Sequence, residues 1–158
     1  MHRLATSKGA IVMDMLSREL GREKLSAILK EFLRQHAGTS ITWHDLQAAI
    51  EARSGTDIRW FFGQWFERTG APEFDLSWKI CGDRICGVIT QPSPFYRATL
   101  EVELSGDGHS ETEKMDVWSE RSEFAFPAGF RVDQVAVDPY YKVLHWLPGF
   151  RPGSRAPD

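Results

Sequence analysis

Residues 58–72 read IRWFFGQWFERTGAP and mark the point at which the hydrophobic pattern of this chain changes. Within this stretch the aromatic residues recur with the spacing of a helix. Gly70 and Pro72 then end the helical pattern, because proline cannot continue a helix. From Glu73 onward, apolar residues alternate with polar ones, which is typical of strands. The sequence therefore predicts an α+β protein with its helices first and its strands after.

Three further helices are predicted before this stretch, which makes a bundle of about four. The first carries a continuous apolar stripe and ends at Gly21, and the second has apolar residues at i, i+3, i+4, i+7 and i+8. The third begins at Thr42, which resembles a capping box with Asp45 three residues later, and stops at Gly55. The two stripes consist of Ile11, Val12, Met15, Leu16 and Leu20, and of Leu25, Ile28, Leu29, Phe32 and Leu33.

About seven short strands are predicted after Pro72. Trp78 and Ile80 alternate with polar neighbours, as do Leu100, Val102 and Leu104, while Gly, Pro, Asp and Ser clusters between the strands are typical of turns. This spacing favours an antiparallel β-sandwich. We therefore expect a helical subdomain over residues 1–72, a β-sandwich over 73–148, and a flexible tail rich in Pro, Gly and Arg over 149–158.

The composition is that of an ordinary globular protein. Hydrophobic residues make up 42% of the 158 residues, which is enough for a core, and the formal net charge is −3. An acidic balance argues against a nucleic-acid or anionic-membrane partner. No apolar run reaches the ~20 residues of a membrane span, and the first residues have no signal-peptide core. We expect a cytoplasmic location.

Two motifs in the helical part are similar to those of a known family. Lys8-Gly9-Ala10 opens a helix, and Trp65 is followed at fixed spacing by Gly70 and Pro72. Together they resemble the end of the catalytic domain in the zinc aminopeptidases of the membrane alanyl aminopeptidase type, the gluzincins. In the strand part, Val137-Asp138-Pro139 resembles the close of the small sandwich that follows that domain. The resemblance covers roughly residues 5–147.

The resemblance implies a relation to peptidases, yet key parts of their chemistry are missing from these 158 residues. The zinc-binding His-Glu-x-x-His and the Gly-x-Met-Glu-Asn substrate loop do not occur. The position that matches the family's catalytic tyrosine, two residues before Lys8, is Thr6. A threonine hydroxyl is shorter and much less acidic than a phenol. We therefore predict no catalytic residue, no metal site and no cofactor in this chain.

The five histidines support the same expectation. No two of them have the i, i+4 spacing of a metal-binding helix. His36 is expected to cap a helix C-terminus, where an imidazolium interacts favourably with the helix dipole. His44 is expected to be solvated in a first helical turn, and His109 to be exposed in a turn. His145 is expected to be a half-buried structural residue.

The two cysteines suit a β-hairpin. With Asp83-Arg84 as a two-residue turn, Cys81 would face Cys86, close to disulfide range. A pair of reduced cysteines packing as small hydrophobic groups, a disulfide and a functional redox pair all remain open.

The first helix is predicted to form an interface. Met13 lies about 100° from Val12 around the helix, so it widens the apolar arc beyond what one neighbouring helix can bury. Unburied apolar surface of this kind usually marks a contact surface. We expect a homodimer, or a protein partner, docked around Val12, Met13 and Leu16.

Two functions follow from these observations. The first is a non-catalytic C-terminal part or homologue of a zinc aminopeptidase that acts as a structural and interaction module. The alternative is a free-standing protein-interaction domain with no peptidase role. An unrelated hydrolase would be a third, which a broad substrate screen would detect.

Overall fold

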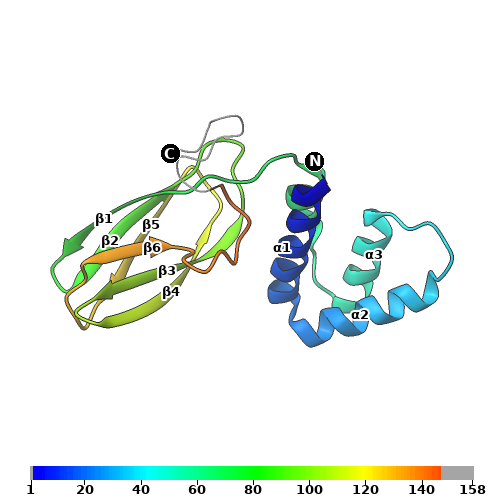
Figure 1. The fold of residues 1–158 in the computed structure, drawn as a ribbon, viewed down its shortest axis with the longest axis horizontal. Helices are drawn as coiled ribbons and strands as arrows, with labels where there is room; N and C mark the ends of the chain where they lie inside the picture. The colour runs from blue at the N-terminus through cyan, green and yellow to red at the C-terminus, as the bar shows by residue number, and fades with distance from the viewer. Residues whose placement is uncertain (1, 147–158) are drawn as a thin grey trace. The chain divides into compact units, whose positions relative to one another are not determined.

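The computed structural model describes residues 2–146, with side chains from Lys8 onward. It divides into two compact units, Met1–Gly70 and Ala71–Asp158 (Figure 1). The first unit is helical and the second consists of strands, so the α+β class is confirmed. None of the helices described is long and apolar enough to cross a membrane.

The helical unit contains, among its described residues, α1 (His2–Leu20), α2 (Arg22–Gln35), α3 (Trp43–Ser54) and the short α4 (Arg59–Phe62). A π-helical turn, η1 (Gly63–Glu67), continues α4. Gly21 separates the first two helices with a φ of 88°, a backbone conformation that favours glycine. The predicted fourth helix is therefore shorter and less regular than its sequence pattern indicates.

The capping box predicted at the start of α3 is confirmed. The Thr42 hydroxyl accepts a hydrogen bond from the Asp45 amide at 3.3 Å, and the Asp45 carboxylate accepts one from the Thr42 amide at 2.7 Å. Gly55 ends the helix in the left-handed conformation. The local sequence alone thus sets both ends of this helix.

The apolar stripes of the helices supply most of the core of this unit, although Ile11 and Leu29 are only half-buried. Leu25, Ile28 and Phe32 of α2 are buried, whereas Leu33 is 59% exposed. Its place at i+8 puts it at the margin of the stripe, where no neighbouring helix covers it. The other core residues are Val12, Met15, Leu16, Leu20, Leu46, Ile50, Ile58, Phe61, Phe62 and Trp65.

The second unit has six strands within the described residues, one fewer than predicted. They form two three-stranded antiparallel sheets of order β1-β2-β5 and β4-β3-β6 (Figure 1). The strands are β1 (Asp75–Cys81), β2 (Arg84–Thr90), β3 (Ala98–Gly106), β4 (His109–Val117), β5 (Arg121–Pro127) and β6 (Gln134–Val137).

Alternating residues of both sheets supply the core of this unit. Leu100, Val102 and Leu104 of β3 are fully buried, as are Ile85 and Ile89 of β2. The predicted alternation in β1 fades toward the hairpin: Leu76 and Trp78 are half-buried, but Ile80 is 62% exposed. This end of β1 lies at the edge of its sheet, where one side has no neighbouring strand.

The chain after β6 adds no further strand within the described residues. Asp138 and Tyr141 have φ values of 45° and 51°, which interrupt an extended backbone. The Asp138 carboxylate also accepts the amide hydrogens of Lys142 and Val143, at 2.9 and 2.8 Å. Because these amides are taken by a side chain, they are not available for a sheet ladder. What remains is an isolated parallel bridge between Glu73 and Trp146.

Candidate functional site

The motif Lys8-Gly9-Ala10 lies inside α1, which begins earlier than the motif predicts, and Lys8 is tied to the end of the helical unit. The Lys8 ammonium donates hydrogen bonds of 3.3 Å to the carbonyl oxygens of Arg68 and Gly70. Both carbonyls follow η1, which ends at Glu67, and a charged donor makes a stronger hydrogen bond with a carbonyl than a neutral one does. Lys8 therefore acts as a latch between the two ends of this unit. Thr6 lies in α1, two residues earlier, and its side chain is not among those described.

The aromatic residues that follow form the core of the helical unit. Phe61, Phe62 and Trp65 are each 2% exposed, and the rings of Phe62 and Phe66 stack with centroids 4.6 Å apart. Trp60 is half-buried and packs edge-on against Phe61. The cluster is a packed core of aromatic side chains, as its helical spacing predicts.

A shallow dent with a volume near 300 Å³ adjoins the start of α4. Asp57 and Arg59 line it and pair with each other at 2.6 Å, and the Asp57 carboxylate also accepts the amide of Arg59. The hydrogen bonds from Arg59 lower the pKa of Asp57 to about 2. These contacts fix the local turn that precedes α4, so the charged groups of the dent serve the local fold.

The predicted interface residues differ in how much surface they retain. Val12 and Leu16 are 1% and 0% exposed, while Met13 is half-buried. Of the three, Met13 therefore keeps the surface that an incoming protein could contact.

Three of the histidines have local roles that the structure defines. His36 ends α2: its amide donates to the Phe32 carbonyl at 3.1 Å, and its Nδ1 lies 2.9 Å from the same oxygen. This confirms the predicted cap. His44 is exposed, 3.7 Å from Glu67, and His109 contacts the ring of Phe130. Within residues 2–146, no group of three His, Cys, Asp or Glu side chains is placed to hold a metal ion.

The cysteine hairpin exists, but the predicted register is wrong. Cys81 lies opposite Arg84 and Cys86 opposite Lys79, so the turn is formed by Gly82 and Asp83. Gly82 has a φ of 67°, which a two-residue hairpin turn requires and which glycine adopts without strain. The prediction placed the turn one residue too late because it did not use this preference.

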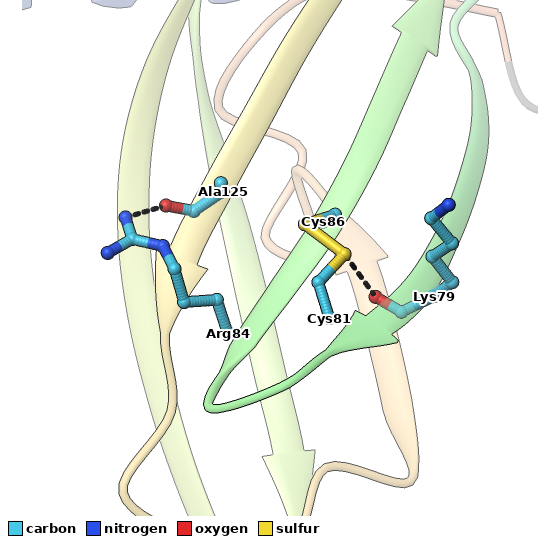
Figure 2. The surroundings of a disulfide bond; sticks show 5 residues. All are labelled: Lys79, Cys81, Arg84, Cys86 and Ala125. Atoms are coloured by element: carbon cyan, nitrogen blue, oxygen red, sulfur yellow. Dashed lines mark hydrogen bonds between the residues drawn. A yellow bond between two sulfur atoms is a disulfide. The ribbon is translucent and has the colours of Figure 1, made fainter.

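Despite the shifted register, Cys81 and Cys86 are joined in a disulfide (Figure 2). They are diagonal neighbours on one face of the hairpin, with Cα atoms 5.9 Å apart, which is inside the usual range. The Arg84 guanidinium donates to the Ala125 carbonyl on the neighbouring strand β5, and the Cys81 sulfur lies near the Lys79 carbonyl (Figure 2). The disulfide therefore closes the β1–β2 hairpin.

A buried charged pair in the strand unit was not expected from the sequence. His145 Nδ1 lies 3.4 Å from the Asp138 carboxylate, and the two side chains are 6% and 1% exposed. Burial acts to raise the pKa of Asp138, but hydrogen bonds from His145, Val143 and Lys142 outweigh it and lower the pKa. Burial likewise acts to lower the pKa of His145, but the hydrogen bond with Asp138 raises it.

The sequence carries a signal for the role of Asp138 as a hydrogen-bond acceptor, but not for its pairing with His145. Asp138 precedes a proline, and an aspartate at such a position commonly accepts hydrogen bonds from amides a few residues later. The sequence cannot show that the folded chain brings His145 back to the same carboxylate, because the intervening turn depends on two unusual φ values.

Comparison with known proteins gives a family match for the helical unit. Residues 2–65 match the model of the peptidase family M1 domain. Over 66 residues, the chain is 35% identical to aminopeptidase N of Lactococcus lactis subsp. lactis, which is 42% of this chain and 8% of that protein. Over 65 residues it is 35% identical to aminopeptidase M1 of Arabidopsis thaliana, which is 41% of this chain and 7% of that protein.

A solved structure extends the likeness beyond the helical unit. Aminopeptidase A of Legionella pneumophila, in complex with aspartic acid, matches with a TM-score of 0.64 and 23% identity. The match covers 77% of this chain and 15% of that one. At this identity the match concerns the fold alone. The chain spans less than a tenth of the length of the two curated relatives.

Proposed function

Because this chain is related to the aminopeptidases of peptidase family M1, we propose that it is a non-catalytic structural and interaction module of that kind. The observation that carries the proposal is the Lys8 latch. In the segment that resembles the family, the motif residue Lys8 makes structural contacts with the carbonyls of Arg68 and Gly70. Its neighbour at the family's tyrosine position is Thr6, which offers neither the reach nor the acidity of a phenol.

In this proposal the helical unit packs against a zinc-bearing catalytic segment, and the strand unit acts as a spacer. The well-defined ends of α3 and the buried aromatic core support a scaffold role, because both fix the positions of the helices. The geometry of the described side chains therefore favours support over catalysis.

The direct test is aminopeptidase activity on amino-acid amides and anilides, measured on the purified 158-residue chain with and without added zinc. We expect no turnover, because polarising the carbonyl and activating the water require a bound metal. Turnover that survives further purification and is abolished by Thr6→Ala or Glu31→Ala would overturn the non-catalytic proposal. Metal analysis after chelator-free purification is the companion measurement, and about one tightly held zinc per chain would also contradict it.

We also propose self-association, or binding of another protein, through the surface of α1. Met13 supports this as the partly accessible member of the set Val12, Met13 and Leu16. Sedimentation velocity at micromolar concentration should show a dimer that Met13→Asp dissociates. If the chain is a monomer at every concentration and Met13→Asp changes nothing, the proposed dimer is wrong. The proposed spacer role would be unaffected.

A further inference from the structure

The segment that follows β6 is organised by one buried carboxylate. Asp138 Oδ1 accepts the Lys142 amide, and Oδ2 accepts the Val143 amide. The same Oδ2 faces His145 Nδ1 at 3.4 Å. An ionised group that is 1% exposed is costly unless its partners are in place. The conformation of residues 138–145 therefore depends on these contacts.

This segment joins the end of the strand unit to its beginning. The Trp146 amide donates to the Pro72 carbonyl at 2.8 Å, and the His145 ring packs against Phe74 with centroids 5.7 Å apart. At its other end, the Asp138 amide donates to the Glu101 carbonyl of β3 at 2.7 Å. A change in the Asp138–His145 contact would therefore also alter the contacts of Pro72 and Phe74 at the start of the unit.

The other charged groups around this segment have separate partners. The Lys142 ammonium lies 2.6 and 2.7 Å from the two carboxylate oxygens of Glu101, and the Tyr140 hydroxyl donates to Glu103 at 3.1 Å. The Tyr141 ring stacks on His145 at 6.0 Å. In the described part of the chain, the Asp138 carboxylate contacts two backbone amides and the His145 ring. Of these, the His145 ring can carry a positive charge.

We propose that Asp138 and His145 form a pH-sensitive clasp, which holds residues 138–146 against residues 72–74 and loosens when the His145 imidazolium loses its proton. The inference concerns the strand unit and does not depend on the proposed function. Protonated His145 offers Asp138 a full positive charge, whereas neutral imidazole offers only a hydrogen bond, which the Val143 carbonyl competes for at 2.9 Å.

The direction of the pH effect follows from the pKa shifts. The pKa of His145 is higher in the folded chain than its ordinary value of 6.5, so the clasp is complete below about pH 6.5 and weakens as the pH rises through the raised value. The lowered pKa of Asp138 keeps its carboxylate ionised throughout this range.

The test is a nuclear magnetic resonance titration of the whole 158-residue chain. The Hε1 signal of His145 gives its pKa, and the carbonyl signal of Pro72 reports the hydrogen bond from Trp146. We expect His145 to titrate above the ordinary value, and the Pro72 carbonyl to shift with the same midpoint. A pKa of His145 at or below about 6.5, or a Pro72 signal that does not move across that midpoint, would overturn the clasp.

Two variants and one control sharpen this test. Asp138→Asn should lower the pKa of His145, and His145→Gln should abolish the pH response of the Pro72 carbonyl. His109→Gln removes an exposed histidine of the same unit and should leave both signals unchanged. If a response persists in His145→Gln, another group drives it and the proposal fails. If either variant does not fold, the titration of the unmodified chain decides the question.

Discussion

Gly106 lies at the end of β3, where the backbone of residues 131–133 passes against it. A Cβ atom at this position would overlap the Arg131 carbonyl oxygen and lie 2.9 Å from the Asp133 amide nitrogen. This loop before β6 is held there by a hydrogen bond of 2.9 Å from the Asp133 amide to the Ser105 carbonyl. Because backbone cannot move aside as a flexible side chain can, glycine is required by close approach and not by its φ angle.

We predict that Gly106→Ala lowers the free energy of unfolding by about 1–3 kcal/mol, the range for overpacking a closely packed site. Urea denaturation monitored by circular dichroism measures the change. Gly129→Ala is the matched control, because a Cβ atom there meets no other atom within 4 Å and the residue has no positive φ. Equal stability of the two variants would show that residues 131–133 move aside easily.

Lys8 offers a second test at the scale of one side chain. Replacing it by methionine keeps the aliphatic stem and removes the two hydrogen bonds to Arg68 and Gly70. We expect a loss of about 0.5–1.5 kcal/mol, the net contribution of a typical hydrogen bond, because the site is partly open to water. Lys30→Met, at an exposed position of α2, is the control for the change in charge. Identical unfolding curves for both variants would show that the hydrogen bonds of Lys8 do not stabilise the helical unit. The main support for the proposed function would then be lost.

At the scale of the elements, α3 depends on its ends as well as on its packing. Leu46 and Ile50 are its buried side chains among those described, and Trp43 packs against Phe66 with ring centroids 4.5 Å apart. The capping box at Thr42 and the left-handed Gly55 satisfy backbone groups that the helix itself leaves without partners.

Thr42→Ala should therefore destabilise the helical unit by about 0.5–2 kcal/mol, the usual cost of losing an N-cap side chain. Thermal unfolding followed at 222 nm is the measurement. Ser40→Ala, in the exposed loop before the helix, serves as the control and should leave the melting temperature unchanged. Thr42→Ser, which keeps the hydroxyl, should retain most of the stability; its failure to do so would point to the lost methyl group instead of the cap.

At the scale of the whole molecule, several carboxylates are more acidic in the folded chain than in an unfolded one. Hydrogen bonds from Arg34 lower the pKa of Glu31 to about 2, and those from Arg59 do the same for Asp57. Thr42 lowers the pKa of Asp45, and partners in the strand unit lower that of Asp138. Both units therefore contain carboxylates that favour the folded state when ionised.

Because these folded pKa values are depressed, the stabilisation is present above the unfolded values near 4 and is lost as the pH falls toward about 2. We predict acid unfolding in that range, measured by chemical denaturation at a series of pH values. Glu31 and Asp57 are at the surface, so 1 M salt should weaken their contribution. On acidification, the double variant Glu31→Gln with Asp57→Asn should lose less of its free energy of unfolding than the unmodified chain does. A pH dependence unchanged by both salt and substitution would assign acid unfolding to other groups.

The sequence by itself determined the order of helices before strands, the capping box of α3, the His36 cap and the relation to aminopeptidases. These features rest on local spacing or on short motifs, which act within a few residues of the chain. The alternation in β3 likewise identified Leu100, Val102 and Leu104 as core residues, because a strand presents every second side chain to one face.

Only the tertiary structure decided the features that depend on distant partners. Leu33 and Ile80 fit apolar patterns, yet they are exposed because no neighbouring element covers them. No further strand follows β6 in the described residues, because Asp138 takes amides that a ladder would use. Asp138 and His145 form a charge pair because the folded backbone brings residue 145 back to the Asp138 carboxylate. The spacing of residues along the sequence determines local geometry. Burial and pairing depend instead on which distant residues the fold places next to one another.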